Sequence, residues 1–277
     1  MTRSALCLDD LGLHAGVNAA AAALARLGRL NAVSCMVGAA CWGGTGEALA
    51  ACGAAGADVG LHLDLTEAPL RLPRQTLPML ILRSHAHLLA TAALRDEIDA
   101  QLDAFEAVLG RPPDHVDGHQ HVHQLPQVRD ALIEVLQRRY LSARPWLRST
   151  RHAANLVRPA GQPPAAALKP RVIQALGAAG LARLAVRHGH RQNARLLGVY
   201  DFSGGPAGYR AWLHAWLQAA HDGDLLMCHA STEPVESDPI GIARHDEWRL
   251  LGSPEFAAML AQSGVELRPV GRMEALR

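Results

Sequence analysis

The chain has few cysteines, no excess of charge of either sign and no long run of apolar residues. Its five cysteines are odd in number and none forms a CxxC pair, so we expect buried, reduced thiols rather than a disulfide framework. The 27 lysines and arginines nearly balance the 26 aspartates and glutamates, which argues against a nucleic-acid partner. No secretory signal is visible at residues 1–10, and the alanine-rich residues 15–32 carry arginine and asparagine. We therefore expect a cytoplasmic protein without a transmembrane segment, for which a homodimer is one possible assembly.

An internal repeat and a glycine-rich phosphate loop are also missing. Instead, apolar runs alternate with helical patterns along the 277 residues. The apolar runs predict strands at residues 4–8, 31–38, 57–65, 115–119, 141–147, 194–202, 223–229 and 265–270. Strands that alternate with helices form a mainly parallel sheet, so the fold class is α/β. We favour a single irregular (β/α) barrel of seven to eight mainly parallel strands over an open, doubly wound sheet.

Two stretches stand out between the predicted strands. Residues 94–110 form the clearest amphipathic helix, because apolar side chains recur at helical spacing from Ile98 to Leu109 and Gly110 can end it. Residues 148–193 are rich in proline, arginine, alanine and histidine, with one helical piece at residues 171–187. We interpret them as a functional insertion in a single domain that spans residues 1–277. A proline-rich connection is expected before the helix at 94–110, and a loop after the strand at 223–229.

Polar residues follow four of the predicted strands. They are Asp9 and Asp10 in "ALCLDD", His62 in "VGLHLDL", His119, His121 and His123 in "HVDGHQHVH", and His229 in "LLMCHAS". The carboxyl ends of parallel strands converge on one face, which is where ligands bind. Each residue also has an ordinary alternative, since an aspartate can cap a helix and a histidine can be a core residue with its ring nitrogens bonded. Four separate strand ends of this kind nevertheless indicate one shared site.

The residue types at these strand ends suit a metal ion. One aspartate and two histidines would form a three-ligand site with open positions for water and substrate, which a catalytic metal needs. Such ligands favour zinc, cobalt, nickel or manganese over magnesium. The alternation in "HQHVH" would place all three histidines on one side of an extended chain, unless the backbone bends there.

Four segments carry a resemblance to a known family. "LDDLGL", "GLHLDLTE", "DGHQHVH" and "MCHAS" resemble, in order, the signature segments of the YdjC/ChbG family of carbohydrate deacetylases, and they span residues 8–231. Members associated with hopanoid biosynthesis share these motifs, so the subfamily stays open. The resemblance implies an irregular (β/α) barrel related in chemistry to the polysaccharide deacetylases. It also implies one divalent metal ion, zinc or magnesium.

The resemblance assigns a role to each motif residue by its position. The implied metal ligands are Asp10, His62 and His119, the implied general base is Asp9, the implied general acid is His229, and His121 and His123 become supports or sugar contacts. Arg144 in "LSARPW" resembles a strand-end arginine that could orient a carboxylate. The chain departs from the family pattern at Leu11, Asp64 and Ala230, of which Asp64 would add charge near the metal.

These residues lead to a hypothesis of metal-dependent hydrolysis. The metal and Asp9 would activate water against the N-acetyl group of an amino sugar or oligosaccharide, and His229 would protonate the leaving amine. One alternative is a metal-dependent amidohydrolase or phosphoesterase acting on another substrate, although such barrels typically show an H-x-H pair at the first strand. The other is a non-catalytic barrel that binds a sugar or a metal, which the pairing of a base with an acid makes less favoured. The expected partner is an N-acetylated sugar.

Overall fold

A computed structural model describes residues 1–273, and its centre is a sheet of parallel strands. The order of the strands is β5-β4-β3-β2-β1-β7-β6, and β8 pairs with the first residues of β1. Every pairing is parallel. The strands are β1 (Thr2–Leu11), β2 (Ala32–Cys35), β3 (Asp58–Leu63), β4 (His115–Gly118), β5 (Trp146–Leu147), β6 (Leu196–Leu197), β7 (Asp224–Cys228) and β8 (Val265–Leu267).

The two edges of this sheet approach each other. The Leu147 amide of β5 donates to the Arg191 carbonyl at 2.9 Å, and the Leu196 amide of β6 donates to the Arg151 carbonyl at 2.7 Å. These contacts are isolated bridges rather than a continuous ladder. The prediction of an irregular, mainly parallel α/β barrel is therefore confirmed, and the irregularity lies between β5 and β6.

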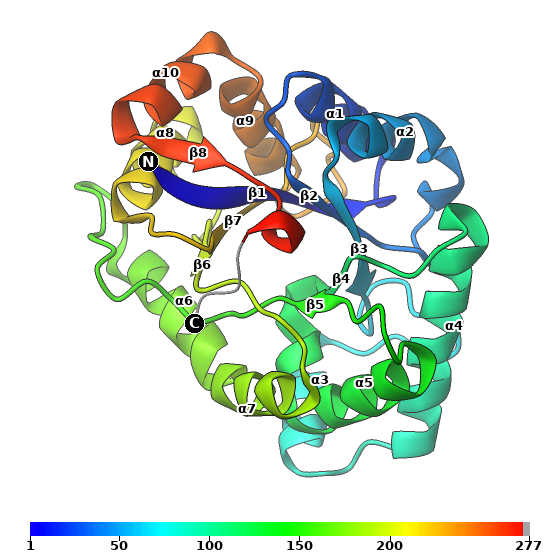
Figure 1. Ribbon diagram of the computed structural model, residues 1–277. Coiled ribbons are helices and arrows are strands. Elements are labelled where there is room, and N and C mark those ends of the chain that lie inside the picture. Colours follow the sequence, from blue (N-terminus) through cyan, green and yellow to red (C-terminus); the bar gives the residue numbers. More distant parts are fainter. Residues whose placement is uncertain (274–277) are drawn as a thin grey trace.

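Helices cover the outside of the strands (Figure 1). Within residues 1–273 the α-helices are α1 (Ala15–Arg26), α2 (Gly46–Ala55), α3 (Leu77–His85), α4 (Thr91–Leu109), α5 (Pro126–Arg139), α6 (Pro164–Ala175), α7 (Ala178–His188), α8 (Gly205–Ala219), α9 (Gly241–Leu251) and α10 (Pro254–Ser263). The predicted amphipathic helix is α4, which buries Ile98, Leu102 and Phe105 and ends at Gly110 in a left-handed conformation. Among the described residues, no helix is both long and apolar enough to cross a bilayer.

Two helices lie where connections were expected. α3 replaces part of the proline-rich connection, with a proline in its first turn, a position that lacks an intrahelical amide bond in any case. α9 replaces the loop after β7, and its buried face includes Arg244 and Glu247. A helix with charged residues on its buried side shows no apolar stripe, which is why the sequence pattern does not predict it.

The stretch predicted as an insertion contains α6 and α7 rather than one helical piece. The break falls at Gly177, where an added Cβ would lie 2.0 Å from the carbonyl oxygen of Gln124. The chain packs too closely there for any side chain. The interpretation of residues 148–193 as an insertion in a single domain stays a prediction.

Alternation along the strands decides what fills the barrel. On β1, Leu6 and Leu8 pack in the large cluster with the helices, whereas Ala5 and Cys7 belong to a smaller cluster with residues of β2, β5, β6 and β7. By the same alternation, Asp9 continues the inner row of β1. Along the inner side of β1, apolar side chains are thus followed by a polar one at the carboxyl end of the strand.

Candidate functional site

Three of the predicted residues meet at the carboxyl ends of β1, β3 and β4. Asp10 Oδ1 lies 2.9 Å from His119 Nδ1 and 3.3 Å from His62 Nε2. One donor atom from each of these residues lies within 4.8 Å of the others. Asp10 and His62 are buried and His119 is partly exposed, so the cluster is open on one side.

A backbone irregularity turns Asp10 toward this cluster. The pairing register of β1 with β2 shifts between Leu8 and Leu11, and Asp10 adopts a left-handed conformation with φ of 67°. In regular alternation Asp10 would face the helices, opposite to Asp9. A local bulge of this kind re-aims a side chain, and positive φ at a non-glycine residue is retained where the surroundings enforce it.

The donor set of the cluster fits a divalent cation. His62 Nδ1 lies 2.6 Å from the buried carboxylate of Asp117, which fixes the ring so that Nε2 faces Asp10. Burial lowers the pKa of His62, but Asp117 and Asp10 outweigh burial and raise it to about 10. The free protein therefore holds positive charge at this ring, in the position where a bound cation would replace the proton. One carboxylate oxygen and two imidazole nitrogens leave room for further ligands.

Asp9 is held by an arginine that the sequence prediction missed. Arg148 is fully buried, and its guanidinium lies 2.5 Å from Asp9 Oδ2, 2.6 Å from Asp9 Oδ1 and 2.5 Å from Asp117 Oδ2. The predicted Arg144 lies elsewhere, because it is exposed before β5 begins and donates to the carbonyl of His188 at 2.9 Å. Arg148 directly follows the strand residues Trp146–Leu147, so the strand-end rule could have selected it.

His229 is positioned from α9. Its backbone amide donates to Glu247 at 2.5 Å, and Arg244 donates to its carbonyl at 3.3 Å. Arg244 also lies 2.7 Å from Asp10 Oδ2, so one arginine joins the loop of His229 to the predicted metal ligand. The ring of Phe202 meets the His229 ring edge-on at 5.2 Å. Burial lowers the pKa of His229 to about 4, so the ring is neutral in the free protein at neutral pH.

The remaining two histidines of "HQHVH" do not join the cluster. β4 ends at Gly118, and Gln120 and His121 have left-handed backbone conformations with φ of 52° and 62°. The three histidines therefore do not alternate along an extended chain. His123 donates to the carbonyl of Arg148 at 2.9 Å, and His121 is buried with no hydrogen-bond partner at Nδ1 among the described residues.

The carboxylate of Asp64 is bound by backbone amides of its own loop and is not a free charge beside the candidate metal ligands. One of its oxygens accepts the backbone amides of Thr66 and Glu67 at 2.8 and 3.0 Å, and the other accepts that of Ala68 at 2.5 Å. Its carboxylate shapes the loop after β3 instead.

Two other groups of potential ligands overlap this region. They are Cys7–His115–Asp117 and Asp9–His62–Asp117. The guanidinium of Arg148 lies 3.0 Å from Cys7 Sγ and within 2.7 Å of both Asp9 and Asp117. Arg148 binds both oxygens of Asp9, whereas Arg244 binds Oδ2 of Asp10 and leaves Oδ1 facing His62 and His119. The group around Asp10 is therefore the better candidate for a metal ion.

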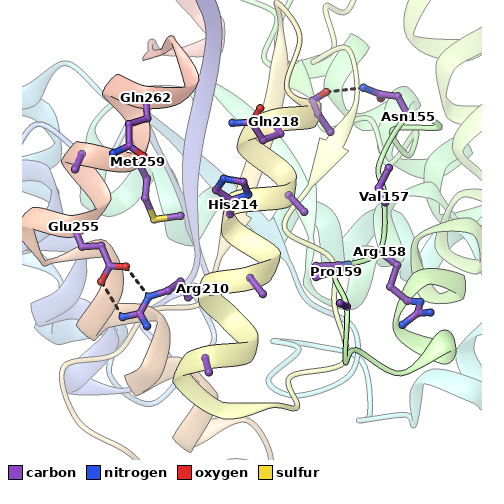
Figure 2. Close-up of a pocket in the computed structure, with 16 residues that line it drawn as sticks. Asn155, Val157, Arg158, Pro159, Arg210, His214, Gln218, Glu255, Met259 and Gln262 are labelled. Carbon is purple, nitrogen blue, oxygen red and sulfur yellow. Dashed lines mark hydrogen bonds and ion pairs between the residues drawn. The ribbon is translucent and has the colours of Figure 1, made fainter.

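A groove of about 920 Å³ lies away from these residues (Figure 2). It is bordered by α8, α10 and the chain at residues 155–160. Arg210 of α8 pairs with Glu255 of α10 at 2.6 Å. None of the predicted site residues lines it, so its size alone does not connect it with the chemistry of the strand ends.

Comparison with known proteins gives one family match over most of the chain. The sequence profile of the YdjC-like proteins matches residues 5–262. A carbohydrate deacetylase from Mus musculus is 54% identical over 48 residues, which are 17% of this chain and 16% of the mouse protein. A chitooligosaccharide deacetylase from Yersinia enterocolitica is 40% identical over 78 residues, 25% of this chain and 31% of that protein. The chain thus spans less than a third of the length of the curated relatives it matches.

Solved structures of low sequence identity share the fold. A putative cellobiose-phosphate cleavage protein from Enterococcus faecalis V583 superposes with a TM-score of 0.65 at 16% identity, covering 97% of both chains. A protein of unstated function from Agrobacterium tumefaciens C58 gives 0.53 at 12% identity, covering 98% of this chain and 88% of the other. At these identities the likeness concerns the arrangement of strands and helices alone.

Proposed function

The chain belongs to the YdjC-like family, and from that premise we propose that it is a metal-dependent carbohydrate N-deacetylase that removes the acetyl group from an amino sugar. Family relatives named as carbohydrate and chitooligosaccharide deacetylases support this substrate class, although they match only short parts of the chain. The observation that carries the proposal is the cluster of Asp10, His62 and His119 beside the carboxylate of Asp9 and the ring of His229.

The proposed metal ligands are one oxygen of Asp10, Nε2 of His62 and Nδ1 of His119. A divalent ion bound there would supply Lewis-acid polarisation of the amide carbonyl and would acidify water. Two imidazoles and one carboxylate favour zinc over magnesium, because nitrogen ligands suit zinc better. Asp117 supports the set by holding the His62 ring through Nδ1 at 2.6 Å.

Asp9 is the proposed general base. Arg148 binds both of its oxygens, which fixes the carboxylate in one orientation and leaves its remaining lone pairs to accept a proton from water. A base held in one geometry loses little entropy on reaching the transition state. Because Arg148 is buried in a medium of low dielectric constant, solvent hardly screens the attraction between its guanidinium and the Asp9 carboxylate.

His229 is the proposed proton donor to the departing amine. An amine leaves only after protonation, since the free amide anion is too basic. The ring is neutral in the free protein because burial lowers its pKa to about 4. Its role therefore requires the ring to take up a proton before the amine leaves, either the proton that Asp9 removes from water or one from solvent. The negative charge that develops on the reacting carbonyl would favour this uptake by raising the pKa of a nearby imidazole.

Measurement of acetate release from a panel of N-acetylated sugars, with zinc or magnesium added to metal-free protein, tests the proposal. Asp9→Asn should keep metal binding and reduce the rate on the order of 10²–10⁴-fold. His119→Ala should weaken metal binding itself, measured by titration calorimetry. Phosphate release, or sugar binding without any turnover, would contradict deacetylation, and full activity of Asp9→Asn would contradict the role of Asp9.

A further inference from the structure

The positive charge of this chain is concentrated in one segment. Between Tyr140 and Tyr200 the sequence has ten arginine and lysine residues and no aspartate or glutamate, although the whole chain carries 27 cations and 26 acids. All acidic residues therefore lie outside this segment. The segment is strongly basic, and the rest of the chain has a net negative charge. This uneven distribution of charge favours one orientation of the molecule toward a charged partner.

Three of these cations lie on the outside of α6 and α7 without an acidic neighbour. Arg148 and Arg195 are neutralised by ion pairs inside the fold. By contrast Arg171, Arg183 and Arg187 are exposed, and none of them pairs with a carboxylate within residues 1–273. Their charge is thus directed at the solvent.

Aliphatic side chains lie between these arginines. Leu168 and Val172, one helical turn apart on α6, are 55% and 49% exposed, and Val186 on α7 is 81% exposed. The opposite side of α7 buries Leu181 and Ala185. Figure 1 shows α6 and α7 following each other along the outer edge of the barrel. On each helix the exposed residues are spaced by three or four positions, so they lie on one side of that helix. We call the six residues Leu168, Arg171, Val172, Arg183, Val186 and Arg187 the basic-aliphatic face.

We propose that the basic-aliphatic face binds the surface of an anionic lipid bilayer. Arginines flanking aliphatic side chains on a helix suit the boundary between phosphate headgroups and acyl chains, where the cations meet the phosphates and the aliphatic groups insert. A nucleic acid would satisfy the arginines but not the aliphatic groups, and the aromatic residues of the segment that could stack on bases, Tyr140, Trp146 and Tyr200, are buried. This interaction is separate from the proposed hydrolysis.

One residue of α6 connects this helix with the surroundings of the candidate site. Lys169 points inward from α6, donates to the carbonyl of Tyr200 at 2.8 Å and lies 4.5 Å above the Phe202 ring. That ring contacts His229. α6 therefore reaches the surroundings of His229 through Lys169 and Phe202.

Vesicle flotation of the full chain tests the proposal. The protein should float with vesicles of phosphatidylcholine and phosphatidylglycerol, less with pure phosphatidylcholine, and less at high salt. The triple variant Arg171→Gln, Arg183→Gln, Arg187→Gln should lose about fivefold in affinity for each cation, on the order of 100-fold in total. Leu168→Gln with Val172→Gln should weaken binding without changing its dependence on salt.

A charge-matched control separates this surface from net charge. Arg74→Gln, Arg111→Gln, Arg268→Gln removes three exposed arginines elsewhere and should keep flotation nearly unchanged. Circular dichroism checks that both triple variants fold. The proposal is overturned if the wild-type chain does not float with anionic vesicles, if both triple variants lose binding equally, or if heparin or an acidic protein competes for the face while vesicles do not bind.

Discussion

Asp117 lies between the proposed metal ligand His62 and Arg148, the arginine that holds the proposed base. Its Oδ1 receives His62 Nδ1–H at 2.6 Å, and its Oδ2 receives Arg148 at 2.5 Å and Ser34 at 2.7 Å. One buried carboxylate thus orients a proposed metal ligand and, through Arg148, the proposed base Asp9. The pKa of Asp117 lies well below its usual range, because these positive partners outweigh its burial.

Asp117→Asn should therefore weaken metal binding even where the variant remains folded. An asparagine can present its amide group to Ser34 but provides no charge to hold the His62 ring and Arg148, so we expect a loss of about 10–100-fold in metal affinity. Titration calorimetry with zinc measures it. Asp58→Asn is the matched control, since Asp58 is also buried and bonds Trp146 Nε1 at 3.0 Å at the opposite end of β3. Equal losses in the two variants would contradict the orienting role of Asp117.

At the scale of elements, the junction of α6 and α7 fixes the loop that carries the histidines. Gly177 packs against the carbonyl of Gln124, the last residue of the short helix that begins at His119. Gly177→Ala would bring its Cβ to 2.0 Å from that oxygen and should destabilise the fold by about 1–3 kcal/mol. Gly180→Ala, three residues later in α7, is the control, because its Cβ would meet only the flexible end of Arg129. Thermal unfolding compares them, and equal melting temperatures would contradict the close packing.

The elements also differ in how far the sequence predicts them. Alternating apolar runs predict the barrel and its strand ends, so the sequence alone assigns Asp10, His62 and His119 to one rim. The polar buried side of α9 gives no such pattern, and Arg148 is held by carboxylates distant in the chain, one of them 139 residues earlier. The bend after Gly118 depends on left-handed backbone at Gln120 and His121, a conformation that neither residue type predicts.

At the scale of the whole molecule, charge is divided between an inner and an outer system. Inside, Arg148 and Arg244 are buried against Asp9, Asp117 and Asp10, so cations and carboxylates nearly balance around the strand ends. Outside, the basic-aliphatic face keeps its charge exposed. The chain thus has near-neutral total charge without being uniformly neutral, and it is the distribution rather than the sum that bears on partners.

The buried histidines predict how the stability of the metal-free molecule depends on pH. Burial lowers the pKa of His115, His123 and His229 to about 4, from 6.5 in the unfolded chain. Between those values the unfolded state binds more protons, so the free energy of unfolding should fall as the pH is lowered from 6.5 toward 4. Burial raises the pKa of Glu247 to about 7, so the folded state binds one additional proton there, which opposes the effect of the histidines. Three histidines outweigh this single group. The pKa of His62 is raised to about 10, so this ring affects stability only above pH 6.5, where the free energy of unfolding falls as the pH rises.

Urea unfolding at a series of pH values, with a chelator present, checks this expectation. Stability should be greatest near pH 6.5. His115→Gln removes one of the three titrating rings while an amide can still bond Ser34, as the His115 ring does at 3.0 Å. The slope of unfolding free energy against pH below 6.5 should then decrease by about 1.4 kcal/mol per pH unit. The exposed His87→Gln serves as the control and should leave the slope unchanged. A stability that rises on acidification, or an equal change of slope in both variants, would show that the buried rings are not neutral in the fold.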